Sequence, residues 1–120
     1  MMISIQQMQN GINRFVEQEI ASQMNGWQKL AVETVVGLYV ANLPQYIQQI
    51  GSNPMLAPLG LIENGMIDLD AVYAEAAKHF ESPLVFQVPM IGAFEFTKAN
   101  LDTLYTIIKQ GGSGYGVYGT

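Results

Sequence analysis

The fold is decided by the stretch Leu84-Val-Phe-Gln-Val88, Pro89-Met-Ile-Gly92, Ala93-Phe-Glu-Phe-Thr97, which runs into a helical segment from Lys98 to Ile108. Aromatic and β-branched residues recur at every second position in the first and third segments, which is the pattern of a strand with one buried face. The proline fixes φ and the glycine permits a positive φ, as a short hairpin loop requires. The stretch therefore predicts a β-hairpin that leads directly into a helix.

Thr97 has the properties of an N-cap for this helix, because its hydroxyl can accept a hydrogen bond from the free N–H of Asn100. Phe96 and Leu101 then occupy the two positions of a hydrophobic staple. An apolar stripe at i, i+3, i+4 and i+7 is expected to face the sheet; it comprises Leu101, Leu104, Tyr105 and Ile108. Two strands and one helix do not make a stable core, so the unit needs the earlier part of the chain or another copy.

The composition restricts the function. A chain of 120 residues predicts one domain. It has no cysteine, which removes thiol chemistry and cysteine-ligated zinc, and its net charge of −5 argues against a nucleic-acid partner. Only 12% of residues are charged, about half of the usual ~25%, while 49% are hydrophobic. Much of the surface must therefore be uncharged or covered, and we expect a homo-oligomer.

No membrane partner is expected. The N-terminus lacks the basic start and apolar core of a signal peptide. The most apolar run, Leu30 to Leu43, contains Glu33 and is shorter than the ~20 residues that a membrane span needs.

The N-terminal part is predicted to be helical. Residues 3–24 carry an apolar stripe and a glutamine-rich polar face, and Asn25-Gly26 is a helix stop. Residues 27–43 are apolar nearly all round, which predicts a core or interface helix; a buried strand pair is the alternative. Pro44 ends or kinks this helix, and residues 45–50 are expected to form only a short turn.

The middle of the chain is an irregular connector followed by a helix. Glu63-Asn64-Gly65 is typical of a tight type I′ turn between two short strands. Asp68 is the expected N-cap of a helix that extends to about Phe80, with Ile67 and Val72 as its staple.

The predicted fold class is α+β. One domain is expected over residues 1–110, with a helical part at 1–51, a connector at 52–65 and a helix–hairpin–helix part at 66–110. Residues 111–120 are half glycine and predict a flexible tail, although Tyr115 and Tyr118 alternate with small residues and could add a strand to a neighbour's sheet edge.

No motif in the sequence predicts a catalytic residue, a cofactor or a metal. The run from Asn64 to Asp68 resembles the middle of a calcium loop. Aligned with such a loop, however, the chain has an alanine at position twelve, where a bidentate glutamate is needed. His79 is the only histidine and no motif supplies an orienting partner. The densest acidic group could hold a hard cation or act as an acid/base pair, but helix capping explains part of it; it consists of Glu63, Asp68, Asp70 and Glu75.

The candidate functional residues are instead those of an interaction surface. They are apolar or aromatic residues of the 27–43 helix and of the tail: Trp27, Val35, Leu38, Tyr39, Tyr115 and Tyr118.

Three segments carry a family resemblance: Gly26-Trp-Gln-Lys29, Gly65-Met-Ile-Asp-Leu-Asp-Ala-Val-Tyr73, and Phe94-Glu-Phe-Thr97 with Leu101-Asp-Thr-Leu-Tyr105. Over residues 5–108 the sequence resembles small uncharacterised proteins encoded in phages and prophages of gut and Gram-positive bacteria. The resemblance implies an accessory or virion-associated role, in the bacterial cytoplasm or the virion, and implies no active-site residues.

We therefore expect a small non-enzymatic protein that acts through self-association and protein–protein contacts. Two alternatives come from other classes of function. One is an acidic inhibitor of a nucleic-acid-binding protein, and the other is a small-molecule-binding or hydrolytic protein that uses His79 and the nearby acids.

Overall fold

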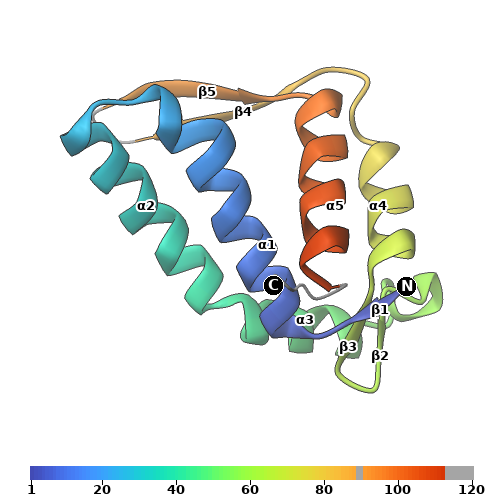
Figure 1. Cartoon of the computed structure of the whole chain (residues 1–120). Helices are drawn as coiled ribbons and strands as arrows, with labels where there is room; N and C mark the ends of the chain where they lie inside the picture. The colour runs from blue at the N-terminus through green and yellow to red at the C-terminus, as the bar shows by residue number, and fades with distance from the viewer. Residues whose placement is uncertain (89–90, 113–120) are drawn as a thin grey trace.

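The computed structural model describes residues 1–88 and 91–112 and confirms the α+β class. The elements of these residues are β1 (Met2–Ile3), α1 (Ile5–Phe15), η1 (Val16–Ile20), η2 (Ala21–Gln23), α2 (Gly26–Ala41), α3 (Leu43–Ser52), η3 (Ala57–Leu59), β2 (Ile62–Glu63), β3 (Met66–Asp68), α4 (Leu69–Ala77), β4 (Leu84–Val88), β5 (Gly92–Phe96) and α5 (Lys98–Gly112). Helix α1 lies between α2 and α5, and α4 lies on the far side of α5 (Figure 1).

Two hydrophobic clusters hold these helices together. The first joins β1, α1, α3, β3, α4 and α5 through Ile3, Met8, Ile47, Ile67, Leu69 and Ile108. The second joins α1, η1, α2 and α5 through Phe15, Val16, Val32 and Ile107, and Val88 and Phe96 of the β4–β5 hairpin pack against it. Leu104 of α5 packs against both clusters, so α5 connects them.

Helices α1 and α5 approach each other closely at Gly11. A Cβ atom at this position would lie 2.3 Å from Cγ1 and 3.0 Å from Cα of Ile108. Gln7, one turn earlier in α1, donates a hydrogen bond from Nε2 to the carbonyl oxygen of Ile108, at 3.1 Å. The glycine, which costs helix stability, is therefore explained by the space that α5 occupies.

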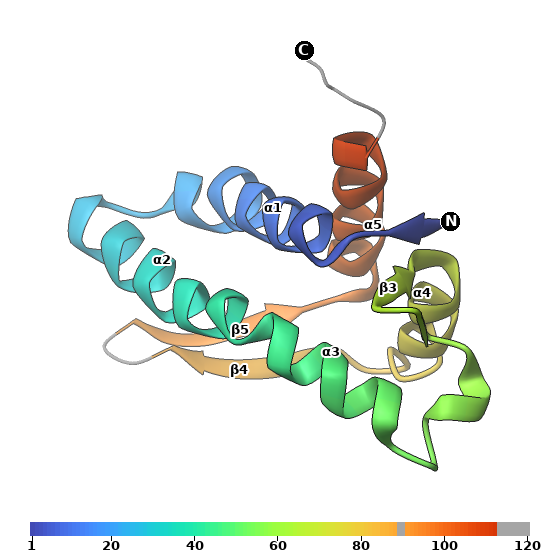
Figure 2. The ribbon, with the colours of Figure 1, turned by 90° about the horizontal axis from the view of Figure 1, so that it is seen from below.

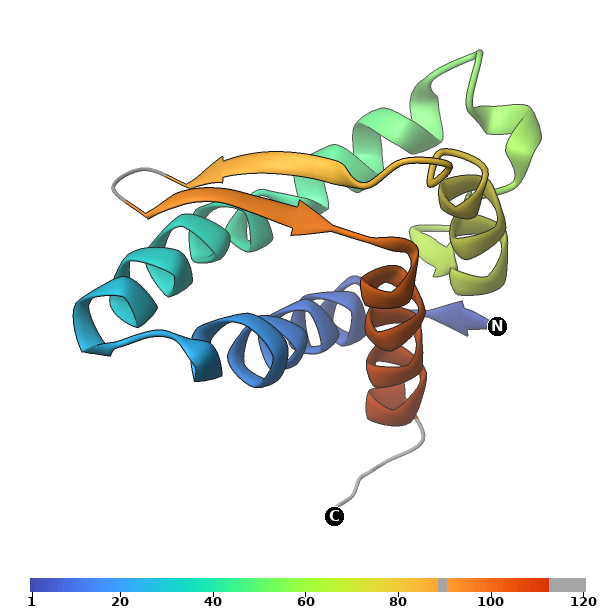
Figure 3. The same ribbon diagram turned by 90° about the horizontal axis from the view of Figure 1, so that it is seen from above.

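Two antiparallel sheets complete the fold. One has the strand order β1-β3-β2, and its β2–β3 turn has positive φ angles at Asn64 and Gly65, as expected for a type I′ turn. The other is the β4–β5 hairpin, in which Phe86 pairs with Phe94 and Leu84 with Phe96. The hairpin lies across α1 and α2, with β4 on the α3 side and β5 leading to α5 (Figures 2 and 3).

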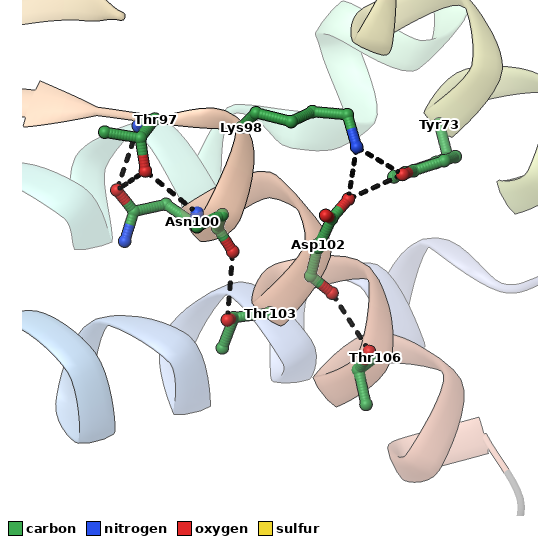
Figure 4. Close-up of polar contacts among 8 residues, drawn as sticks. Tyr73, Thr97, Lys98, Asn100, Asp102, Thr103 and Thr106 are labelled. Atoms are coloured by element: carbon green, nitrogen blue, oxygen red, sulfur yellow. Dashed lines mark hydrogen bonds and ion pairs between the residues drawn. The ribbon is translucent and has the colours of Figure 1, made fainter.

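The predicted helix caps are confirmed. Asp68 Oδ1 accepts a hydrogen bond from the N–H of Ala71 at 3.2 Å, and Thr97 Oγ1 accepts one from the N–H of Asn100 at 3.2 Å. Asn100 Oδ1 in turn accepts a hydrogen bond from the N–H of Thr97 at 2.9 Å (Figure 4). Both donors and both acceptors lie within four residues, which is why the sequence alone predicts them.

Several predictions for the N-terminal part need correction. The helix expected over residues 3–24 is α-helical only to Phe15 and continues as a π turn and a 3-10 turn. The strand-pair alternative for residues 27–43 is wrong, because α2 covers 26–41. Residues 45–50 are not a short turn but belong to the ten-residue helix α3, in which Pro44 stands near the N-terminus, where its missing N–H costs nothing.

The C-terminal part differs in two respects. The apolar stripe of α5 does not mainly face the sheet, because Ile108 packs against Gly11 of α1 instead. Helix α4 ends at Ala77 rather than near Phe80. Of the predicted tail, Gly111 and Gly112 extend α5, and Tyr115 and Tyr118 lie outside the described residues.

We predict that Gly11→Ala lowers the free energy of unfolding by about 1–3 kcal/mol, because the added methyl group meets backbone as well as side-chain atoms of Ile108. Gly37→Ala is the matched control: nothing lies within 4 Å of its Cβ position, so the change removes only a helix penalty and raises the free energy by up to about 1 kcal/mol. Urea unfolding at low protein concentration measures both. Equal stability of Gly11→Ala and the unmodified chain would contradict the assigned packing.

Candidate interaction surface

Helix α2 is built from local signals and buries one side. Asn25 and Gln28 form a reciprocal capping box at its start. At its other end, Gln9 of α1 donates a hydrogen bond from Nε2 to the carbonyl oxygen of Val40, at 2.9 Å, which satisfies one of the free carbonyls of the last turn. Val32 and Val40 are buried and Val36 packs against the second cluster, so this side of α2 faces the protein.

The opposite side of α2 is apolar and exposed. Residues spaced three, four and seven apart share this side of a helix, and all are exposed and uncharged; they are Trp27, Leu30, Thr34, Gly37, Leu38 and Ala41. The exposed fractions are 51% for Trp27, 66% for Leu30 and 64% for Leu38. We call these six residues the outer face of α2.

The outer face continues into a longer uncharged surface. From Thr34 to Ile62 the sequence contains no acidic or basic residue, and this run covers the second half of α2, all of α3 and η3. Three large apolar side chains of the run beyond α2 are also exposed: Tyr46, Met55 and Leu59. Charged side chains, which keep most monomer surfaces hydrated, are therefore absent from one part of the chain.

Gly37 differs from Gly11 in a way that bears on this surface. Both lie inside helices, where glycine costs roughly 1 kcal/mol relative to alanine. At Gly11 the neighbouring helix fills the space, whereas at Gly37 nothing lies within 4 Å of the Cβ position. The described residues of this chain therefore give no packing reason for the glycine at position 37.

The sequence-predicted interaction residues divide into three groups. Trp27 and Leu38 lie on the outer face of α2. Tyr39 is 64% exposed but lies on the flank of the helix with the half-buried Val35. Tyr115 and Tyr118 lie outside the described residues. Leu30 was not predicted, although its position three residues after Trp27 is the signal that would have identified it.

Strand β4 forms a second exposed apolar surface that the sequence did not predict. Leu84, Val85 and Phe86 are 42%, 57% and 50% exposed. Leu84 and Phe86 point to the same side of the hairpin as Phe96, and the ring of Phe96 contacts Phe15 of α1 at a centroid distance of 5.8 Å. The predicted alternation correctly places Leu84 and Phe86 on one side of β4, but the expected burial of that side is wrong, because both residues are exposed.

A polar cluster joins α4 to α5 (Figure 4). Lys98 Nζ donates hydrogen bonds to Asp102 Oδ1 at 2.7 Å and to Tyr73 Oη at 2.8 Å, and the Tyr73 hydroxyl donates to Asp102 Oδ1 at 2.5 Å. Hydrogen bonds from Lys98 and then Tyr73 lower the pKa of Asp102, and the bond to Asp102 raises the pKa of Lys98. Each charged group of the cluster has its partner within it, and the cluster links α4 to α5 at the protein surface. We call these three residues, Tyr73, Lys98 and Asp102, the clasp.

Further contacts extend the clasp along the two helices. The Tyr73 and Tyr105 rings are stacked, with centroids 4.4 Å apart. The Tyr105 hydroxyl donates a hydrogen bond to Asp70, whose other oxygen accepts one from the Met1 amino group at 2.6 Å. These bonds, that of Met1 first, lower the pKa of Asp70, and the bond to Asp70 raises the pKa of Tyr105.

The structure separates the acidic group that the sequence singled out. Asp68 caps α4 and Asp70 belongs to the contacts that extend the clasp, while Glu75 lies 3.3 Å from Lys78 Nζ and 3.6 Å from His79 Nε2. His79 is largely exposed. Within residues 1–88 and 91–112, no group of three or more histidine, aspartate or glutamate side chains is arranged to hold a metal ion.

The same residues contain no helix that is both long and apolar enough to cross a membrane. An open groove of about 370 Å³ lies between α1, α3 and the β2–β3 turn. Its lining contains no ionisable side chain and consists of Ile5, Pro44, Ile47, Gln48, Gly51, Ser52, Ile62, Asn64 and Gly65. It therefore lacks the convergent acid, base or nucleophile of a catalytic site.

Comparison of the chain with protein-family models, with curated proteins and with solved structures finds no match.

We predict that the Lys98–Asp102 pair contributes stability near neutral pH and not in acid. Because the pKa of Asp102 is lower in the folded chain, this contribution is complete above the unfolded value of about 3.9 and is lost as the pH falls through the folded value. Asp102→Asn should therefore lower the urea midpoint at about pH 7, and this effect should shrink as the pH falls and Asp102 becomes protonated in the folded chain.

Glu81→Gln, a charge change outside the clasp, is the control and should not alter the pH dependence in this way. An Asp102→Asn effect that keeps the same size as the pH is lowered would show that the side chain acts by shape rather than by charge.

Proposed function

We propose that this chain is a small non-enzymatic protein that acts through self-association, and that two copies meet at the outer face of α2. The single observation that carries the proposal is the set of exposed, uncharged residues on the side of α2 opposite its buried valines. Exposed apolar patches of this kind on soluble chains mark sites of association.

The spacing of the outer face supports a helix–helix contact. Trp27, Thr34 and Ala41 repeat every seven residues, and Leu30 and Gly37 follow the first two by three. These are the a and d positions of a heptad, which form the seam between paired helices. Small residues in the middle of the seam permit the two helix backbones to approach closely, which supplies a reason for the glycine at position 37.

The face is also complementary to itself. In an antiparallel pair with a two-fold axis at Thr34, the bulky Trp27 lies opposite the small Ala41 of the second copy. Leu30 lies opposite Leu38 of the second copy in the same arrangement. Each large side chain thus meets a neighbour of suitable size, as an isologous two-fold contact requires.

Electrostatics favour the same surface. Each copy carries a net charge of −5, so two copies repel unless they meet where no acidic side chains face one another. The outer face of α2 contains no charged residue. Burying its apolar side chains therefore incurs no free-energy cost from desolvating a charge or from bringing like charges together.

The contact is moderate in size. Three half-exposed large side chains at roughly 100 Å² each offer about 300 Å² per copy, against the ~800 Å² per partner of a standard interface. We therefore propose a reversible, concentration-dependent association. The resemblance to phage- and prophage-encoded proteins extends the proposal to an accessory or virion-associated role, in the bacterial cytoplasm or in the virion.

We predict that Leu38→Glu lowers the mean molar mass of the protein in solution, because it introduces a carboxylate into the α2–α2 contact, opposite Leu30 of the second copy. Light scattering after size exclusion, over a series of protein concentrations, makes the measurement. Met55→Glu is the matched control, since Met55 is 84% exposed and lies outside α2; it should retain the mass of the unmodified chain. An unchanged mass for Leu38→Glu would refute the proposed contact.

A further inference from the structure

Strand β4 has an open edge. The β4–β5 sheet has two strands, and among the described residues β4 pairs only with β5. The outward N–H and C=O groups of such an edge are a template for another strand. β4 is the strand on the α3 side of the hairpin, while β5 leads into α5 (Figures 2 and 3).

This edge lacks the features that keep edge strands apart. Monomeric proteins protect their edges with lysine and other charges, proline, bulges or covering segments. β4 reads Leu-Val-Phe-Gln-Val, with no charge, no proline and an unbroken five-residue register. β5 carries Glu95. The two strands thus differ, and it is β4 that is open to pairing.

The exposed side chains of β4 provide apolar surface beside this open edge. Leu84 and Phe86 on one side of the hairpin and Val85 on the other are each about half exposed. A two-stranded hairpin is marginal unless further strands or helices cover it. A third strand beside β4 would cover apolar surface on both sides of the sheet at once.

A second copy of β4 fits this edge. An antiparallel pair with Phe86 on the two-fold axis uses all five residues of each strand. Leu84 then lies opposite Val88 of the other copy, and Val85 opposite Gln87. No like charges face one another across the pair, which matters for two chains that each carry a net charge of −5.

We infer that β4 is a second self-association surface, at which two copies join their hairpins into one four-stranded antiparallel sheet. The inference rests on the proposed function in that the occupant is again a second copy, but it uses different residues. With one two-fold contact at α2 and another at β4, each copy binds two neighbours. The product is therefore an assembly larger than a dimer, either an open chain or a closed ring of copies.

The test uses Val85→Lys in the full chain. Val85 faces Glu95 across the hairpin, so the introduced ammonium gains an opposite charge within its own copy and the fold is retained. At the β4–β4 contact the same ammonium faces its counterpart on the diagonal, where like charges repel. Val85→Thr is the matched control, because it has nearly the same shape and no charge.

Light scattering over a concentration series gives distinct outcomes. The unmodified chain and Val85→Thr should exceed twice the chain mass of 13.2 kDa, Val85→Lys and Leu38→Glu should each stop at the dimer, and the double variant should be monomeric. If Leu38→Glu has no effect while Val85→Lys alone yields monomers, the α2 contact fails and the β4 contact stands. If Val85→Lys retains the mass of the unmodified chain, the β4 inference is overturned.

Cross-linking tests the register directly, because the chain contains no cysteine. Under mild oxidation Phe86→Cys should form a disulfide-linked dimer, since both copies of this position lie on the axis, and Glu95→Cys on β5 should not. Equal cross-linking at both positions would refute the pairing.

A further full-length variant, Tyr115→Ser with Tyr118→Ser, examines the other occupant that the sequence suggests. It should keep the mass of the unmodified chain. A loss of mass equal to that of Val85→Lys would assign the β4 edge to a neighbour's tail and overturn the β4–β4 contact.

Discussion

The close approach of α1 and α5 at Gly11 is the constraint on which the rest of the structure depends. Without a side chain at this position, Ile108 fits against the backbone of α1, and the Gln7 side chain completes the contact with a hydrogen bond. Because α5 contributes to both hydrophobic clusters, its distance from α1 sets the position of each. The hairpin leads directly into α5, so its place across α1 and α2 follows from the same contact.

The same arrangement explains why α2 is only half covered. Helix α1 takes α5 on one side and α2 on the other (Figure 1), and the hairpin lies across the second cluster. These neighbours cover Val32 and Val40, and no described element lies beyond α2. The charged residues of the chain lie before Thr34 or after Ile62. One part of the chain thus carries the charged side chains, and the other, residues 34–62, carries none.

The sequence predicted what residues within four positions of one another determine. The caps at Asp68 and Thr97, the turn at Asn64-Gly65 and the presence of the β4–β5 hairpin all fall in this class, because donor, acceptor and backbone requirement lie together in the chain. It also predicted that the 27–43 helix would carry apolar residues on most sides, and Trp27 and Leu38 lie on the surface that results. Leu30 lies on the same surface because it follows Trp27 by three positions, which is the spacing of one helical face.

What the sequence could not predict depends on contacts between distant segments. The apolar stripe of α5 has the same spacing whether the helix packs on a sheet or on another helix. Its packing against α1 depends on Gly11, which lies opposite Ile108. The alternation of β4 predicts which side chains share a face of the strand but not whether anything covers that face. The sequence places Gln7 and Gln9 on the polar face of their helix. In the structure their side-chain amides donate hydrogen bonds to backbone carbonyls of α5 and α2. The pairing of Met2 and Ile3 with β3 has no local signal at all.

The first hydrophobic cluster also determines when the chain can fold during synthesis. Gln7 and Ile108, which bond directly, are 101 residues apart, and Ile3 finds its strand partner only at Ile67. Ribosomes add roughly 5–20 residues per second, so α1 and α2 leave the ribosome seconds before α5 exists to receive α1. For that interval the second cluster lacks Ile107 and the hairpin residues, so α2 has only α1 and η1 to pack against. In the proposed association, the order of synthesis therefore allows copies to meet at α2 before each copy has completed its own core.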